Sequence, residues 1–123
     1  MTRELICNAL MMALRCRGFP RDVMVHSDRS SQYCSHDYQQ ILRRYGLICS
    51  MSRKGNCWDN AVAESFFHTL KTELIYSEQY ATREIAKQSI FQYIEVYYNR
   101  MRRHSAIGSI APVAFENRYK MLA

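Results

Sequence analysis

Apolar residues recur at helical spacing near the start of the chain. The apolar set that follows Thr2 consists of Leu5, Ile6, Ala9, Leu10, Ala13 and Leu14. Threonine is a favourable N-cap, whereas Gly18 and Pro20 are residues that end a helix or cannot continue it. The pattern therefore predicts a first helix from Thr2 to about Gly18.

Two later stretches show the same periodicity. Ser35 is a good N-cap for a second helix that closes at Gly46, with apolar positions at Tyr38, Ile41, Leu42 and Tyr45. Thr82 similarly precedes a long helix from Arg83 to about Tyr98. We expect its apolar side chains to form core: Ile85, Ala86, Ile90, Tyr93, Ile94 and Tyr97.

Two short apolar runs predict strands on either side of the second helix. The first run, from Val23 to His26, stops at a polar cluster that contains Asp28, and the second runs from Leu47 to Met51. A strand, helix and strand of this length predict a right-handed βαβ unit with parallel strands. Because ligands of open α/β sheets bind beyond the carboxyl ends of parallel strands, Asp28 is a candidate site residue.

The stretch from Trp58 to Lys71 predicts a further helix that begins after Asp59 and Asn60, and this helix carries the second candidate acid, Glu64. Asp59 and Asn60 can cap this helix, and its apolar side, expected to be buried, consists of Phe66, Phe67, Leu70 and Leu74. The opposite side presents Glu64, His68 and Lys71. Taken alone, such a face is more typical of solvated surface than of a site. The 35 residues from 29 to 63 separate Asp28 from Glu64.

Composition favours one domain with a polyanionic partner. The chain has 123 residues, and 17 Lys and Arg against 11 Asp and Glu give a net charge of +6. This excess of positive charge suits nucleic acid. Five cysteines without a CxxC pair indicate reduced thiols in a cytoplasmic protein, not a disulfide framework or zinc site. No apolar run approaches the ~20 residues of a membrane span, so we expect no membrane partner.

Three ordered segments, HSDRSSQY, SRKGNCWDNAVAESFFHTLKTEL and YNRMRRHSAIGSIAPVAFE, resemble the later part of the integrase core of OrfB-type bacterial insertion-sequence transposases. This family is similar to retroviral integrases, and the resemblance covers nearly the whole chain. It implies a ribonuclease-H-like fold and an Asp, Asp, Glu metal triad whose last two members are separated by 35 residues. By that likeness Asp28 is the second acid and Glu64 the third, both ligands of Mg²⁺ or Mn²⁺.

The resemblance also implies contacts with DNA. Lys71 matches a basic residue that the family places seven positions after the glutamate. Arg53 and Lys54, in the loop before the Glu64 helix, and Arg100, Arg103 and His104, in the later block, are further candidates for phosphate contacts; the alternative for both groups is a solvated surface. His26 and His68 flank the acids, and we expect them to pack or support, because imidazole is a poor ligand for magnesium.

The first acid of the triad has no counterpart in the sequence. The resemblance begins with the helix that follows the third strand of the family's sheet, and neither Glu4, on the first helix, nor Asp22, just before the Asp28 strand, can replace that acid. We therefore expect an incomplete ribonuclease-H-like α/β fold: two short parallel strands, four or five helices, and the first three strands missing. Residues 1–123 would form one partial domain, with a core remainder over 1–80 and a C-terminal helix and basic tail over 81–123.

Several functions are compatible with these features. The leading hypothesis is a piece of a transposase integrase core whose family cleaves and joins DNA with metal ions, but which binds the ion weakly and is inactive alone. Alternatives are a non-enzymatic DNA-binding remnant, a regulator of an intact transposase, or a globular leftover without a selected role. Expected partners are DNA, the missing upstream part and an intact transposase.

The sequence departs from the family pattern at Ser30, where the family usually has glycine. If this loop position needs a positive φ, serine would cost roughly 1 kcal/mol.

Overall fold

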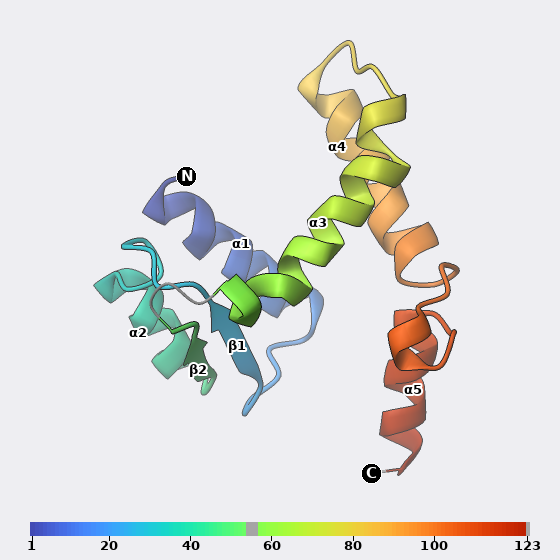
Figure 1. Cartoon of the computed structure of the whole chain (residues 1–123). Coiled ribbons are helices and arrows are strands. Elements are labelled where there is room, and N and C mark those ends of the chain that lie inside the picture. Colours follow the sequence, from blue (N-terminus) through green and yellow to red (C-terminus); the bar gives the residue numbers. More distant parts are fainter. Residues whose placement is uncertain (54–56, 123) are drawn as a thin grey trace. The chain divides into compact units, whose positions relative to one another are not determined.

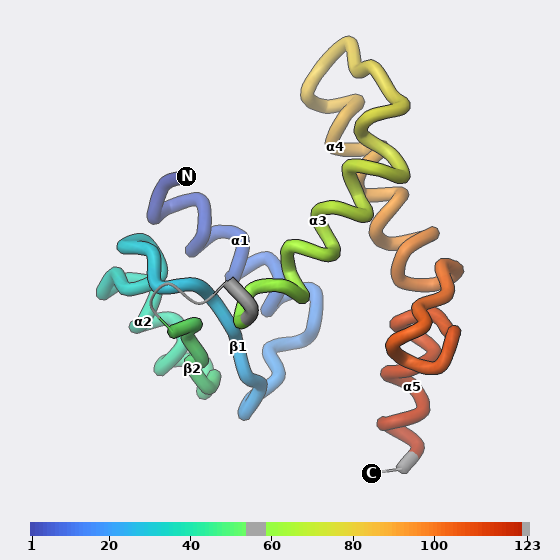
Figure 2. The backbone as a smooth tube through the Cα atoms, viewed as in Figure 1, coloured from blue at the N-terminus to red at the C-terminus, as the bar shows by residue number. Residues whose placement is uncertain are grey.

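The computed structural model describes residues 1–53 and 57–122, with side chains over 1–53 and 59–121, and divides into two compact units (Figures 1 and 2). The first unit is Met1–Phe66 and the second is Phe67–Ala123. The first contains α1 (Arg3–Cys16), β1 (Met24–Ser27), α2 (His36–Arg44), β2 (Ile48–Met51), a 3₁₀ turn (Cys57–Asn60) and the start of α3 (Ala61–Glu73). The second contains the rest of α3, a 3₁₀ turn (Ile75–Ser77), α4 (Arg83–Gln92), a π-helix (Tyr93–Tyr98), a 3₁₀ turn (Ser105–Ile107) and α5 (Pro112–Leu122).

The two strands pair in parallel, as the βαβ prediction requires. Met24 lies opposite Ile48, and Ser27 lies opposite Met51. With five α-helices and two parallel strands in the described part of the chain, the predicted α/β class is confirmed. Because the strands are parallel, the loops that follow β1 and β2 leave the same edge of the sheet.

The predicted helix starts are confirmed in atomic detail. Each cap side chain accepts a hydrogen bond from a backbone N–H three residues later, over 3.2 to 3.4 Å; the pairs are Thr2 with Leu5, Ser35 with Tyr38, and Thr82 with Ile85. Gly46 ends α2 with φ of +66°, and a Cβ there would stand 2.9 Å from the Arg21 guanidinium. The positive φ is what favours glycine at this turn, because the Arg21 guanidinium is the end of a flexible side chain and can move aside.

The core of the first unit lies between α1 and α2 and reaches the sheet. Ile6, Tyr38 and Leu42 are buried together, and Leu42 is only 2% exposed. Partly buried apolar side chains pack against them: Cys7, Leu10, Val25, Tyr33 and Leu47. Burial raises the pKa of Tyr38 to about 12, as expected for a phenol that would have to ionise in an apolar environment.

Part of the core predicted for the long helix is wrong. The α-helix ends at Gln92 and continues as a π-helix over Tyr93–Tyr98, in which Tyr93 is buried but Tyr97 is 43% exposed. A π-helix has a wider turn, so the spacing that aligns residues on one α-helical face no longer applies after Tyr93. Ile85, in the first turn of α4, is also 48% exposed.

The apolar face predicted for α3 is also only partly buried. Leu70 is buried, Phe66 is half-buried, and Phe67 is 54% exposed. Consecutive residues on a helix point about 100° apart, so one narrow face cannot bury both phenylalanines. Among the helices that the structure describes, none has the length and apolar character needed to cross a membrane.

Candidate functional site

Asp28 is the first residue after β1, where the strand pattern predicts it. Its Oδ1 atom accepts a hydrogen bond from the Ser30 backbone N–H at 2.8 Å, so the loop itself holds the carboxylate. Ser30 does not adopt the positive φ that would cost energy there, because the described non-glycine residues with positive φ are Phe19, Asp22 and Ser109. Serine therefore fits this position without a left-handed backbone. Its hydroxyl is buried and has no hydrogen-bond partner among the described atoms.

The loops that follow β1 and β2 are tied together beside Asp28. The Arg29 Nε–H donates to the Ser52 carbonyl at 2.8 Å, and the Ser52 N–H donates to the Ser27 carbonyl at 2.9 Å. Ser52 is only 3% exposed. Sequence reasoning did not select Arg29 or Ser52; the position of Arg29 next to a candidate acid was the one available signal.

Asp59, predicted as a helix cap, holds the loop before α3. Its Oδ2 atom accepts from the Arg53 backbone N–H at 2.9 Å and lies 3.5 Å from the Arg53 Nε atom. The backbone hydrogen bond is the main reason that the Asp59 pKa is lowered, and the charges of Arg53 and His26 lower it further. His26, on β1, also shares a 3.0 Å hydrogen bond with the Ser50 hydroxyl on β2. Within the first unit, Figure 1 shows the start of α3 beside β1.

Glu64 lies in the first turn of α3, where a negative charge is favoured by the helix dipole. Its side chain is exposed and makes no hydrogen bond or ion pair with other described residues. Asp28 is also exposed, and both acids belong to the first unit. The structure does not test whether the two acids bind one ion, so this stays a prediction.

The donor chemistry of the two acids fits a hard divalent cation. Asp28 keeps its second carboxylate oxygen free of the described hydrogen bonds, and Glu64 keeps both of its own. Mg²⁺ is commonly held by only one or two carboxylates, and waters and substrate phosphates complete its shell. No group of three or more His, Cys, Asp or Glu side chains able to hold a metal occurs within residues 1–53 and 59–121.

The candidate DNA contacts fall into different environments. Lys71, in the last turn of α3, and Arg100 and Arg103, after the π-helix, are exposed and make no hydrogen bond or ion pair within the described part of the second unit. Arg53 instead pairs with Asp59. Lys54 lies outside the described residues. These DNA contacts stay predictions.

His104 differs from the neighbouring arginines because it is packed. Its ring meets Tyr98 edge to face with 4.6 Å between centroids, and its Nε2 atom is buried without a hydrogen-bond partner among the described atoms. Burial, and then the charge of Arg102, lower the His104 pKa, which favours the neutral imidazole. A neutral ring is a weaker phosphate contact than a charged one, and the predicted DNA contact of His104 stays untested.

An ion-paired cluster in the second unit was not predicted. Arg102 lies against Glu73, with Nη2 2.8 Å and Nε 2.9 Å from Oε1, and the Tyr93 hydroxyl donates to the Glu73 Oε2 atom at 2.5 Å. The hydrogen bond from Arg102 is the main reason that the Glu73 pKa is lowered. This Glu73 cluster ties the end of α3 to the π-helix and to the segment after it. Its members lie up to 29 residues apart, so sequence periodicity gave no signal.

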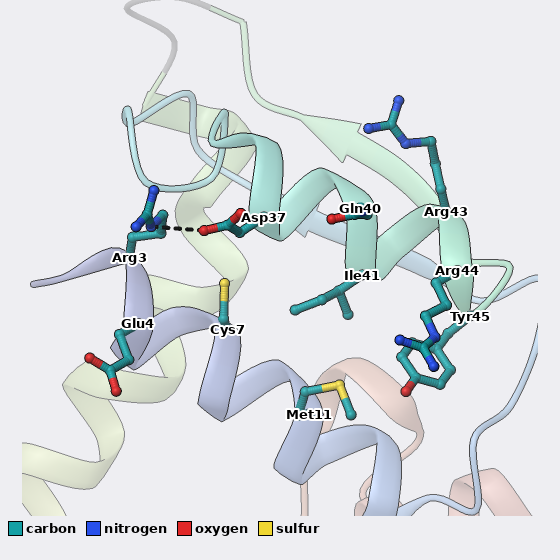
Figure 3. A pocket seen from close by; sticks show the side chains of 10 residues that line it. All are labelled: Arg3, Glu4, Cys7, Met11, Asp37, Gln40, Ile41, Arg43, Arg44 and Tyr45. Atoms are coloured by element: carbon teal, nitrogen blue, oxygen red, sulfur yellow. Dashed lines mark ion pairs between the residues drawn. The ribbon is translucent and has the colours of Figure 1, made fainter.

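A groove of about 900 Å³ lies between α1 and α2 of the first unit (Figure 3). Arg3 and Asp37 form a 3.1 Å ion pair across it, and Arg43, Arg44 and Tyr45 lie at its other end. None of the candidate metal or DNA residues lines this groove. It is therefore a separate feature of the helical side of the unit.

Comparison with known proteins identifies the family. Two family profiles, both described as an integrase core domain, match residues 1–57 and 64–119. Transposase InsF of insertion sequence IS3A from Escherichia coli is 55% identical over 118 residues, which are 96% of this chain and 41% of that relative. A 31 kDa protein of insertion element IS600 from Shigella sonnei, itself uncharacterized, is 50% identical over 123 residues, which are 100% of this chain and 45% of its own length. The chain spans less than half the length of these relatives. It belongs to the integrase core family of insertion-sequence transposases.

Proposed function

We propose that Asp28 and Glu64 are two carboxylate ligands of a divalent cation in a site that cleaves DNA phosphodiesters and joins DNA strands. The observation that carries the proposal is the position of Asp28: it follows β1 at the edge of a parallel pair, with one oxygen held by the Ser30 N–H at 2.8 Å. The 35-residue spacing to Glu64, the family match and the exposure of both acids support it.

Each side chain has a defined part in the proposed chemistry. Divalent ions bound at such a site stabilise the entering and leaving oxygens of an in-line displacement at phosphorus. The Ser30 N–H orients Asp28, while α3 presents Glu64 from its first turn. Lys71, Arg100 and Arg103 neutralise phosphates of the bound duplex and release counterions.

A polypeptide of these 123 residues alone is proposed to be inactive in strand transfer. The family resemblance implies three acids, and neither Glu4 nor Asp22 is placed to be the missing first acid. Glu4 lies in the first turn of α1, and Asp22 precedes β1 in a left-handed conformation with φ of 60°. Loss of one charge from a metal site removes part of the stabilisation of the transition state.

The activity test uses a chimera in which this chain replaces the matching region of the InsF transposase. With Mg²⁺ and a DNA duplex that ends in the terminal repeat of the insertion sequence, the chimera should join strands. Asp28→Asn and Glu64→Gln should each lower the rate at least about 100-fold, the scale on which single electrostatic groups act in catalysis. Asp37→Asn is the matched control, because it removes an exposed, Arg3-paired carboxylate on α2. Wild-type rates in Asp28→Asn or Glu64→Gln would contradict the assignment.

A second candidate is DNA binding without catalysis, as a remnant or as a regulator of an intact transposase. The net charge of +6 and the exposed Lys71, Arg100 and Arg103 favour it. In this case the 123-residue chain should bind duplex DNA with an affinity that falls steeply as salt rises. If no binding is measurable at low salt, this candidate is excluded.

A further inference from the structure

We propose that Asp59 is a positioning residue that fixes Glu64 relative to Asp28 by accepting the backbone N–H of Arg53. The inference rests on the proposed function, since it presupposes that Asp28 and Glu64 bind one cation. It adds a role for a residue that contacts neither acid in the structure. The contacts that carry it all lie in the first unit.

The first half of the link runs from Asp28 to the loop after β2. Ser27, immediately before Asp28, accepts the Ser52 N–H at 2.9 Å, and Arg29, immediately after it, donates to the Ser52 carbonyl at 2.8 Å. Ser52 is therefore held on both of its backbone polar groups by the two neighbours of Asp28. Because Ser52 is 3% exposed, little water competes for these bonds.

The second half runs from that loop to Glu64. Arg53 directly follows Ser52, and its N–H donates to the Asp59 carboxylate at 2.9 Å. The 3₁₀ turn that contains Asp59 is followed immediately by α3, and Glu64 lies five residues after Asp59 on this helical stretch. Since successive helical residues are held by backbone hydrogen bonds, the position of Asp59 sets the position of the first turn of α3.

The backbone bond, and not the guanidinium, is the part of the Asp59 contact that positions the helix. The Arg53 side chain is 77% exposed, and its Nε atom is 3.5 Å from the carboxylate. Exposed ion pairs of this kind are screened by water and contribute little. An N–H from the main chain has no such freedom, so it fixes the carboxylate relative to Ser52. Asparagine keeps an acceptor oxygen at the same distance from the backbone, so Asp59→Asn should retain the hydrogen bond from the Arg53 N–H. Asp59→Ala removes the acceptor and should lose it.

The test follows amide signals of the ¹⁵N-labelled 123-residue chain during titration with Mn²⁺, whose unpaired electrons broaden nearby resonances. In the wild type, signals next to Asp28 and Glu64 should broaden together at the same Mn²⁺ concentration. Asp59→Ala should weaken the apparent Mn²⁺ affinity reported around Glu64 about 10-fold, the lower end for loss of a group that orients a metal ligand. Asp59→Asn and the control Asp37→Asn should keep the wild-type value.

The outcomes separate the inference from the proposed function. Wild-type affinity in Asp59→Ala, with joint broadening intact, would overturn the positioning role and leave the shared site in place. If the wild type broadens next to one acid only, the shared site fails, and the positioning role fails with it. If Asp59→Ala does not give the dispersed spectrum of a folded chain, the positioning role is tested with Asp59→Glu instead. It keeps the charge but displaces the acceptor oxygen, so wild-type affinity in that variant would also overturn the role.

Discussion

The interactions that stabilise the inside of each unit differ between the two units. In the first, Met1–Phe66, apolar side chains of α1 and α2 are buried against a pair of parallel strands, and Leu42 is at the centre of this core. In the second, Phe67–Ala123, the structure describes helices without strands, and the Glu73 cluster joins α3 to the π-helix by charged hydrogen bonds. Stability of the first should therefore depend on packing, and stability of the second more on charge.

The same difference separates the candidate functions of the two units. In the first unit, Asp28 accepts the Ser30 backbone N–H and Asp59 accepts the Arg53 backbone N–H, in the loops that follow the strands. Fixed main-chain donors suit a site in which metal ligands must be placed accurately. The exposed cations of the second unit, Lys71, Arg100 and Arg103, have no such restraints in its described part. Long mobile side chains suit sequence-independent contact with phosphates.

Leu42→Ala should have the largest effect and should act on the first unit. Removal of a leucine side chain that is 2% exposed leaves a cavity, and such changes cost about 2 to 5 kcal/mol. Unfolding in urea, followed by amide signals of residues 1–53, should report this loss. A loss below about 1 kcal/mol would mean that the core collapses around the smaller side chain or that packing does not dominate this unit.

Glu73→Gln should destabilise the second unit by about 1 kcal/mol, because charge-assisted hydrogen bonds are roughly twice as strong as neutral ones and the pair is partly exposed. Signals of residues 67–121 in urea provide the measurement. Glu116→Gln is the matched control: its carboxylate pairs with Lys120 at 3.3 Å in an i,i+4 arrangement on α5. Equal effects of the two substitutions would contradict a special role for the Glu73 cluster.

Arg103→Ala should weaken DNA binding in a salt-dependent way and leave folding unchanged. Loss of one phosphate contact should lower the slope of log affinity against log salt by about 1. Arg118→Ala removes the same charge from an exposed position on α5 and serves as the control. If both substitutions change the slope equally, binding follows net charge and not the block that contains Arg100 and Arg103.

The smallest expected effect is a loss of stability in mild acid that originates at His104. Its pKa is lowered in the folded chain, so the unfolded chain takes up protons first as the pH falls below about 6.5. The contribution of His104 to the stability of the second unit is therefore fully present above this pH and decreases below it. The Glu73 pKa is also lowered in the folded chain, so its contribution to stability decreases as the pH falls below the usual glutamate value of about 4.5. Urea unfolding at several pH values should show the first decrease in the wild type and not in His104→Gln.

Local sequence patterns predicted the elements and the place of Asp28 well. Thr2, Ser35 and Thr82 cap helices as expected, because a cap depends on residues within one turn. The parallel pairing of β1 and β2 also followed from a short strand, helix and strand succession. Fold class and family membership are thus recoverable from the sequence alone.

Contacts between distant residues could not be predicted in this way. The partner of Glu73 is Arg102, the partner of the Arg29 guanidinium is the Ser52 carbonyl, and neither pair has a periodic signature. The change from α-helix to π-helix at Tyr93 likewise has no signature in the apolar pattern, and Tyr97 is exposed where an α-helix pattern predicted core. The shared site of Asp28 and Glu64, the DNA contacts and the single-domain description of residues 1–123 stay predictions.

The most direct test of the central claim is Mn²⁺ titration of the Asp28→Asn chain, read at the amides next to Glu64. If the two carboxylates hold one cation, loss of the first should remove most of the broadening around the second, although that region is unchanged in sequence. Unaltered broadening around Glu64 in Asp28→Asn would show that the two acids bind ions independently, and it would contradict the shared metal site.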